Sequence, residues 1–370
     1  MAGTTRALLL ILFIASASYG QQFHSPKMHK DRSVTFRLKA PNAKRVRLSL
    51  AGRHDMQKGE NGIWELRVEP MEPGLHEYTF DVDGTRVLDP QNRWVKKWLT
   101  CANMLEIPGD PPLVTQFQDV PHGTLHHEVY YSESLGKARR MVVYTPAGYH
   151  ETATRTEGKT GYPALCLLHG NGDDQTAWSE VGRVHLIADN LIAAGKIRPL
   201  VIVMPYGHPI PLPETRDNAY YPRNSDAYAR DLVESALPFV RERYHVSTRQ
   251  ESNFIAGLSM GGGHALDTGL KHANTFSSVG AFSSAAPQAN LTEKYADAAG
   301  PNPKVNQKLK HLWIGIGKKD FLLDRNHKFV AALKENGVRH TYVETEGGHQ
   351  WGLWRDYIER FLCLVAPARD

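Results

Sequence analysis

The sequence predicts a small all-β domain followed by a larger α/β domain. Short segments of alternating apolar and polar residues fill the chain from about residue 33 to 107, and no helical pattern interrupts them. After Pro121, apolar runs alternate with amphipathic helical patterns, which is typical of a mostly parallel sheet covered by helices. A Gly-x-Ser-x-Gly stretch lies in this second part, between an apolar run and a helical pattern.

Length, composition and charge indicate how many domains the chain forms and which partners are excluded. At 370 residues with 41% hydrophobic content, the chain can bury the cores of two domains. The formal net charge of +5 is small for this length and the basic residues do not cluster, so we expect no nucleic-acid partner. Of the three cysteines, Cys166 lies in an apolar run and is expected to be buried, and a pairing of Cys101 with Cys363 is left open.

The first 20 residues have the pattern of a signal peptide. A short positive region, Met1 to Arg6, precedes an apolar core from Ala7 to Ala17, and Ser18-Tyr19-Gly20 offers small residues for cleavage. The apolar core is too short to span a bilayer, and no second such run follows. We therefore expect no membrane span and a secreted or periplasmic mature protein.

Residues 30–108 have the pattern of a small immunoglobulin-like β-sandwich. Four segments alternate apolar and polar residues, and Asp83-Gly84 after the last of them predicts a hairpin turn. Residues 109–120, which begin Gly109-Asp110-Pro111-Pro112, form the expected linker. The alternating segments are Val34–Leu38, Val46–Leu50, Trp64–Val68 and His76–Val82.

Residues 121–370 predict the α/β domain. Two strands, 125–131 and 140–144, open it, and the continuous apolar runs Ala164–Leu168 and Leu200–Met204 are typical of strands covered on both faces. Right-handed crossovers assemble such elements into a three-layer sandwich. Amphipathic helices are expected near Val184–Ala194, Ala227–Tyr244, His327–Glu335 and Tyr357–Leu364, and the last strands at Trp313–Ile316 and Thr341–Val343.

The stretch Gly257-Leu258-Ser259-Met260-Gly261 is predicted to be a nucleophile elbow. It follows the apolar run Phe254–Ala256 and precedes a helical pattern, so Ser259 sits on a sharp strand-to-helix turn. Glycine at positions 257 and 261 removes side chains that would clash in such a turn. The predicted fold class is therefore an α/β-hydrolase, in which the serine hydroxyl stands above the sheet.

A serine nucleophile needs a base and a carboxylate, and in α/β-hydrolases these follow the serine in the order acid, then histidine. Asp320 follows the strand Trp313–Ile316 and His349 follows the last strand, so both lie where ligands bind in such sheets. Asp324 is an alternative acid, but it is farther from the strand end and is expected on the next helix. We therefore predict a triad of Ser259, Asp320 and His349.

The backbone N–H groups of Met260 and Asn171 are the predicted oxyanion hole. Met260 directly follows the serine, and Asn171 lies in the loop after the third strand of the domain. No cofactor and no metal are implied. His126 and His127 are adjacent, so on a strand they face opposite sides, and no Cys or His spacing fits zinc.

The first domain resembles the early-set, glycogen-binding-like sandwiches that precede catalytic domains in many carbohydrate-active enzymes. The resemblance implies that Trp94 and Trp98 either stack on sugar rings or only pack against the neighbouring domain. It rests on the motifs Phe36-x-x-x-Ala40-Pro41-x-Ala43, Gly62-x-Trp64, Pro73-Gly74-x-x-x-Tyr78 and Val82-Asp83-Gly84.

The chain from about residue 121 to 366 resembles the esterase D family of α/β-hydrolases, a group that includes secreted feruloyl esterases and acetyl-xylan-type carbohydrate esterases. The loops of the family that carry acid and base support Asp320 and His349. Pro205-Tyr206-Gly207 departs from the family, in which many members have Asn or Asp before this glycine. Besides the elbow, the matching motifs are Pro121-His122-Gly123, Arg139-Arg140-Met141-x-Val143-Tyr144, Leu167-Leu168-His169-Gly170 and Gly348-His349-x-Trp351.

The expected function is hydrolysis of carboxylic esters on carbohydrate, with feruloyl or acetyl groups of a xylan-type polysaccharide, or a small ester, as substrate. Tyr206, Trp351 and Trp354 are candidates to line the acyl pocket, since flat aromatic walls suit a hydroxycinnamoyl group. The alternatives are a siderophore esterase of the enterochelin type, an acyltransferase, and a non-catalytic glycan-binding protein with a relict hydrolase domain. We expect the second domain alone to fold and to keep most activity on a small ester.

Overall fold

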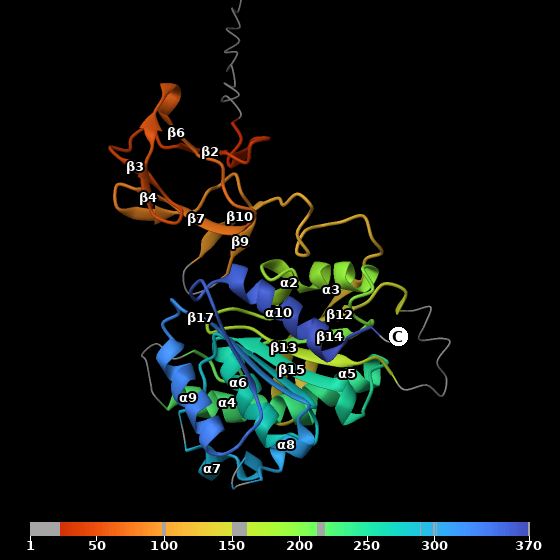
Figure 1. The fold of residues 1–370 in the computed structure, drawn as a ribbon. Coiled ribbons are helices and arrows are strands. Elements are labelled where there is room, and N and C mark those ends of the chain that lie inside the picture. The colour runs from red at the N-terminus through yellow and green to blue at the C-terminus, as the bar shows by residue number, and fades with distance from the viewer. Residues whose placement is uncertain are drawn as a thin grey trace, which may run out of the picture.

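The computed structural model describes residues 23–97, 101–149, 161–212, 219–288, 290–298, 300 and 302–368. The predicted signal peptide and Trp98 therefore lie outside the described residues. Strands before residue 108 form a β-sandwich, and those after residue 123 form a mixed sheet with helices on both faces (Figure 1). The predicted fold class, an α/β-hydrolase domain preceded by a small sandwich, is confirmed.

The sandwich packs a sheet of order β1-β2-β6-β5 against a sheet of order β4-β3-β7-β10-β9, in which β8 also pairs with β7. The ring of Tyr78 lies in its core, 4.8 Å from that of Phe36 and 6.0 Å from that of Phe80. Val82 pairs with Thr85 across the hairpin expected at Asp83-Gly84. The strands are β1 Lys27–Met28, β2 Val34–Lys39, β3 Val46–Ser49, β4 Arg53–Asp55, β5 Gln57–Lys58, β6 Ile63–Val68, β7 Gly74–Val82, β8 Thr85–Val87, β9 Val95–Lys96 and β10 Ala102–Ile107.

The sheet of the second domain has the order β11-β12-β14-β13-β15-β16-β17-β18. β12 pairs antiparallel with β11 and β14, and the other neighbours pair parallel. Every residue of β13 and β14 is buried, which explains their continuous apolar sequence. The strands are β11 Thr124–Ser132, β12 Lys137–Thr145, β13 Ala164–Leu168, β14 Val201–Pro205, β15 Asn253–Leu258, β16 Ser278–Phe282, β17 His311–Gly317 and β18 Thr341–Thr345.

Helices bury apolar side chains against both faces of this sheet. α2, α3 and α10 pack on the face toward the sandwich, and α4, α5, α6 and α9 pack on the other face (Figure 1). The helices are α2 Ala177–Glu180, α3 Val184–Ala193, α4 Tyr220–Asp231, the π-helical turn η2 Leu232–Ala236, α5 Leu237–Arg243, α6 Met260–Lys271, α7 Leu291–Lys294, α8 Val305–Lys308, α9 Leu323–Glu335 and α10 Trp351–Val365. Short 3₁₀ turns lie at η1 Glu60–Gly62, η3 Gln250–Ser252 and η4 Ala296–Ala298.

Several elements begin earlier in the structure than the sequence pattern indicates. α4 begins at Tyr220 and not near Ala227. The sequence pattern missed its first turns because two of the side chains that they bury, Asn224 and Ser225, are polar. α10 begins at Trp351, directly after the loop of His349, and not at Tyr357. The sequence analysis also missed β16, whose Gly280 makes room for the Phe361 ring, since a Cβ there would lie 2.9 Å from it.

β10 of the sandwich is buried on both faces, because it is shared between the two domains. Alternate residues of a strand face opposite sides, so Leu105 and Ile107 enter the sandwich core, whereas Met104 joins the core beneath α10. Arg355 of α10 donates to Glu106 of β10 over 2.7 Å. The sandwich therefore packs on the α/β domain through buried apolar and ionic contacts.

The segment expected as a linker also contacts the second domain. Asn190 of α3 donates through Nδ2 to the carbonyl oxygens of Val114 and Gln116, over 2.7 and 2.8 Å. Cys363 of α10 is a free thiol, so it forms no disulfide with Cys101, and Cys166 is buried in β13. None of the helices in the described ranges combines the length and the apolar character that a bilayer-spanning segment needs.

Candidate active site

Ser259 stands on a strained turn between β15 and α6. Its backbone has φ 54° and ψ −117°, a conformation that non-glycine residues rarely adopt. A Cβ at position 257 would lie 2.5 Å from the backbone of Gly261, and one at position 261 would lie 2.4 Å from the carbonyl oxygen of His169. The two glycines of the motif are therefore required by close backbone packing around the serine.

Ser259, His349 and Asp320 form a continuous hydrogen-bond chain. Nε2 of His349 lies 3.0 Å from Oγ of Ser259, and its Nδ1 lies 2.9 and 3.1 Å from the two carboxylate oxygens of Asp320. Asp320 follows β17, and His349 lies between β18 and α10, so all three groups meet at the carboxyl edge of the parallel strands. This is the geometry that general-base activation of a serine needs.

The Asp320 carboxyl is fully covered, yet it favours the ionised form. Burial alone raises the pKa of Asp320, but its hydrogen bond to His349, the charge of that imidazole and the N–H of Leu322 outweigh burial and hold the pKa below its usual value. An ionised Asp320 orients the imidazole with Nε2 toward Ser259. Asp324, the alternative acid, lies exposed on α9.

Met260 and Asn171 lie where the sequence analysis expects donors to an oxyanion. Met260 is the first residue of α6, and the N-termini of helices present N–H groups that favour negative charge. Gly170 and Asn171 line the same pocket as Ser259, and a Cβ at position 170 would lie 3.5 Å from that of Ser259. The two loops thus meet beside the hydroxyl.

Aromatic rings enclose the histidine. His349 lies between Trp354, whose ring centroid is 4.9 Å away, and Phe321, whose ring centroid is 4.5 Å away. Trp351 and Trp354 line the pocket of Ser259, but they are only 2% and 5% exposed and also belong to the core beneath α10. Phe321 is 74% exposed. It forms an open aromatic surface beside the base, for which the sequence carries no signal.

Tyr206 lies in a different place from the two tryptophans. Of the described residues, those that line the Ser259 pocket do not include it. Its ring stacks on His169 at 5.7 Å between centroids, and the Arg139 guanidinium lies 5.4 Å from its centroid. The structure therefore places the Tyr206 ring against His169, and of the three acyl-pocket candidates only Trp351 and Trp354 line the pocket of Ser259.

Two charged side chains of the sandwich also line this pocket. Glu77 of β7 and Lys96 of β9 form an ion pair beside Ser259, His349 and Asp173. The sequence analysis missed both, since they lie more than 160 positions before the serine in a different domain and in no motif.

Comparisons with known proteins show the family of the chain. Residues 132–362, more than half of the chain, match the family model described as "Putative esterase". The chain belongs to this esterase family. Residues 19–98 match carbohydrate-binding module 48, the isoamylase N-terminal domain. The resemblances to an esterase and to a glycogen-binding-like sandwich are thereby confirmed.

Two of the chain's curated relatives are named as esterases of different acyl groups. The chain is 30% identical over 348 residues, or 92% of its length, to an "Endo-1,4-beta-xylanase/feruloyl esterase" of Xylanibacter ruminicola, and it spans 45% of that protein. It is 26% identical over 275 residues, or 65% of its length, to an "Acetyl esterase" of Caldicellulosiruptor saccharolyticus, and it covers 97% of that protein. The chain thus spans about half the length of the first relative.

Solved structures share the fold of one or both domains. A ferulic acid esterase matches 66% of this chain and 98% of its own with a TM-score of 0.55 and 25% identity. The enterobactin esterase of Shigella flexneri matches 96% of this chain and 99% of its own with a TM-score of 0.66 and 18% identity. At that identity the second match shows the fold alone, and its coverage includes the sandwich.

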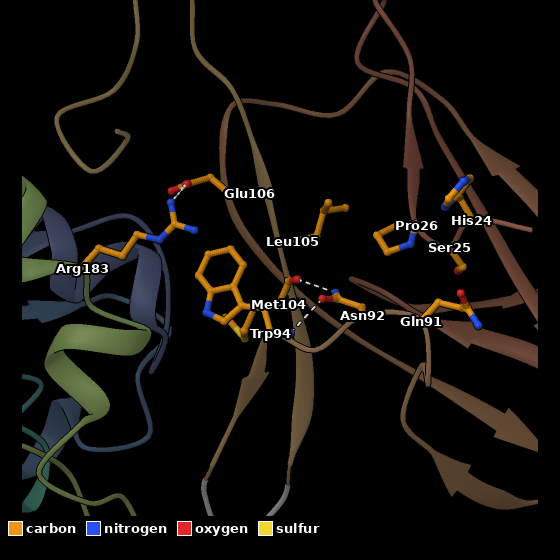
Figure 2. Close-up of a pocket in the computed structure, with 10 residues that line it drawn as sticks. All are labelled: His24, Ser25, Pro26, Gln91, Asn92, Trp94, Met104, Leu105, Glu106 and Arg183. Carbon is orange, nitrogen blue, oxygen red and sulfur yellow. Dashed lines mark hydrogen bonds and ion pairs between the residues drawn. The ribbon is translucent and has the colours of Figure 1, made fainter. Parts of the chain in front are cut away.

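A second hollow lies where the sandwich meets the esterase domain, and Trp94 stands in it (Figure 2). The Arg183 guanidinium of the esterase domain lies 4.1 Å from the Trp94 ring centroid, and the indole N–H donates to the carbonyl oxygen of Glu180 over 3.0 Å. One ring face and the polar edge of Trp94 are thus engaged within the protein. Of the two roles open for this residue, these contacts favour packing between domains.

Metal-binding groups do not gather anywhere in the described ranges: no three or more His, Cys, Asp or Glu side chains there are placed to hold an ion. His126 hydrogen-bonds through Nε2 to Oγ1 of Thr145 over 2.9 Å.

Proposed function

We propose that the chain is an exported serine esterase that hydrolyses carboxylic ester bonds on carbohydrate, with hydroxycinnamoyl groups such as ferulate on a xylan-type polysaccharide as its acyl substrates. The observation that carries this proposal is the hydrogen-bond chain from Asp320 through His349 to Ser259 on the strained elbow. Its residue types and order are those of acyl transfer by a serine.

The proposed reaction runs through an acyl-enzyme. Nε2 of His349 takes the proton of the Ser259 hydroxyl as Oγ attacks the ester carbonyl carbon, and the N–H groups of Met260 and Asn171 stabilise the oxyanion. The C–O bond to the alcohol then breaks, and the alcohol leaves with the proton from His349. Water gives a proton to His349 and attacks the acyl carbon, which releases the acid and restores Ser259. Asp320 stays ionised throughout.

Two features support a carbohydrate ester as substrate. Two relatives of the chain are named a xylanase/feruloyl esterase and an acetyl esterase. Phe321 offers an exposed ring in contact with His349, the residue that protonates the leaving alcohol. Exposed aromatic rings suit the apolar faces of sugars. Trp351 and Trp354 give the pocket of Ser259 flat aromatic walls, against which a flat acyl group would lie.

The test is a substrate panel with purified mature protein: methyl ferulate, methyl p-coumarate, acetylated xylan and a cyclic catecholate siderophore ester. We expect kcat/KM to be highest for the two hydroxycinnamates, and Ser259→Ala to abolish turnover. Release of acetate without hydroxycinnamate turnover would identify an acetyl esterase instead, and cleavage of the siderophore alone would identify a siderophore esterase. No turnover of any substrate by the wild-type protein would favour a relict hydrolase that only binds glycan.

Export is the part of the proposal that rests on sequence alone. The charged, apolar and small-residue regions of residues 1–20 support it. N-terminal sequencing of the protein secreted by its natural host should start near Gln21. An intact Met1 in the mature protein would contradict it.

A further inference from the structure

Glu77 and Lys96 reach the catalytic pocket because of strand register. In the sandwich, Glu77 pairs with Met104 and Lys96 pairs with Ala102. Directly paired residues share a face, and so do residues two apart on β10, so all four project on the side of Met104. That side packs on the esterase domain. The sandwich thus contributes a charged pair to the pocket of Ser259 and His349.

The ion pair of Glu77 and Lys96 costs desolvation free energy at this position. The Lys96 side chain is 7% exposed and that of Glu77 34%, so the ammonium is almost removed from water. Burying such a charge costs several kcal/mol of folding free energy unless partners compensate it. Where a buried pair has only a structural role, two apolar residues of the same size often stabilise the fold equally well. A charged pair at the wall of a catalytic pocket is therefore a candidate for substrate recognition.

Two further residues that line the same pocket carry polar groups. The indole N–H of Trp354 is buried and has no hydrogen-bond partner among the described residues. Asp173 is 7% exposed, and burial raises the pKa of its carboxyl to about 8 although the charge of Lys96 opposes that rise. The Asp173 carboxyl is thus mainly protonated at neutral pH and able to donate. The pocket combines donors and acceptors in a largely apolar enclosure.

The charges of Glu77 and Lys96 indicate which kind of chemical group could bind between them. An anion would meet the carboxylate of Glu77, and a cation would meet the ammonium of Lys96. A neutral group that both donates and accepts avoids both penalties, since its O–H can bond to Glu77 while its oxygen accepts from Lys96. A hydroxyl group on a ring has this chemistry.

We propose that Glu77 and Lys96 of the sandwich, together with the Trp354 N–H, form a polar subsite that binds a ring hydroxyl group on the acyl part of the ester. The assignment rests on the proposed ester hydrolysis at Ser259. The acyl part is favoured over the sugar because the pocket is narrow and its lining includes Trp351 and Trp354, whose flat rings suit an aromatic ring. Phe321, which contacts His349 and is exposed, is not among the residues that line this pocket.

Methyl p-coumarate and methyl cinnamate test the subsite, because they share the leaving group and differ by one ring hydroxyl. The full-length wild-type protein should prefer methyl p-coumarate by about tenfold or more in kcat/KM. Glu77→Gln and Lys96→Met should each bring that ratio close to one, because each removes a partner of the ring hydroxyl and the larger loss of kcat/KM falls on methyl p-coumarate. Lys97→Met, which changes the exposed neighbouring lysine, is the matched control and should keep the wild-type ratio.

Each other outcome overturns the subsite. If both variants slow the two esters equally, Glu77 and Lys96 only support the fold, and thermal melting of the variants would show it. If the variants keep the p-coumarate preference but lose activity on feruloylated arabinose relative to methyl ferulate, the hydroxyl that they bind belongs to the sugar. A wild-type protein that hydrolyses methyl cinnamate equally well refutes the subsite and leaves the esterase function standing. A protein that cleaves neither ester refutes both.

Discussion

Gly172 donates its backbone N–H to Nε2 of His208 over 3.1 Å. The other ring nitrogen lies 2.9 Å from the Tyr220 hydroxyl, which itself donates to the carbonyl oxygen of Ile210. This chain assigns the proton of His208 to Nδ1 and leaves Nε2 as an acceptor. Since Gly172 follows Asn171 directly, a neutral His208 holds the loop that carries one proposed oxyanion donor.

Replacing His208 should therefore reduce catalysis through the oxyanion loop. We expect His208→Phe to lower kcat on an aryl ester by about tenfold or more, with a smaller change in KM, because a misplaced donor is lost mainly in the transition state. Tyr220→Phe keeps the imidazole and should have a smaller effect. Steady-state kinetics on folded variants measures this. An unchanged kcat in His208→Phe would show that the loop holds its position without this bond.

Buried histidines should make the fold sensitive to mild acid. Burial lowers the pKa of His169 and His264 to about 4 and that of His208 to about 3, whereas an unfolded histidine titrates near 6.5. Between pH 6.5 and 4 the unfolded chain binds protons that the folded chain does not, so stability falls as the pH falls. Each histidine contributes up to about 1.4 kcal/mol per pH unit.

Urea unfolding at pH 7, 6 and 5 measures this dependence. The free energy of unfolding should drop steeply below pH 6, because the three histidines outweigh Asp173, whose raised pKa stabilises the folded chain as the pH falls. The surface variant His127→Gln should show the same drop as the wild type. A flat profile from pH 7 to pH 5 would contradict the neutral state assigned to the three rings.

The two aspartates after β17 should differ sharply in their importance. Asp320→Asn should lower kcat by about 10³-fold or more, because the amide favours the wrong imidazole tautomer, whereas Asp324→Asn on the exposed face of α9 should stay near wild type. Ser259→Ala and His349→Ala should each be at least as severe, and the double variant should lose little more. A larger defect in Asp324→Asn than in Asp320→Asn would reverse the assignment of the acid.

The exposed ring of Phe321, beside His349, should affect kcat/KM only for esters that carry a sugar. We expect Phe321→Ala to reduce kcat/KM several-fold on a feruloylated arabinoxylan oligosaccharide and to leave methyl ferulate almost unchanged, because only the first offers a sugar to the ring. Phe117→Ala removes an equally exposed ring of the described surface and serves as the control. Equal losses on both esters would mean that Phe321 supports His349 and does not bind the sugar.

Removal of the sandwich should harm the esterase domain, contrary to what the change in sequence pattern suggests. A chain that begins at Val120 lacks Met104, which belongs to the core beneath α10, and leaves Arg355 without Glu106. An uncompensated buried charge costs about 3–5 kcal/mol. We expect this truncated protein to be insoluble or to melt well below the full chain. A soluble fragment with full activity on methyl ferulate would show that the interface is dispensable.

The proposed triad could be predicted from the sequence because each of its members lies at the end of a strand with a strong local pattern. Ser259 lies in a five-residue motif whose glycines have a steric reason, and Asp320 and His349 follow apolar strands in the expected order. Likewise β13 appeared with its observed bounds, since a strand buried on both faces is continuously apolar.

The remaining features depend on contacts between distant segments, and local pattern does not encode them. Glu77 and Lys96 look like ordinary charged residues on the strands of a sandwich, and only the packing of β10 against α10 turns their face toward the serine. Tyr206 was expected in the acyl pocket because it follows a buried strand. The chain turns there so that its ring stacks on His169 instead.

The ion pair between Glu106 and Arg355 joins residues 249 positions apart. During synthesis the sandwich leaves the ribosome long before α10 is made. The Met104 side of β10 therefore lacks its contacts with α10 until the end of the chain has been synthesised. Contacts of such long range also form slowly. A chain stopped before Trp351 would therefore carry an unfinished first domain as well as an unfinished second one.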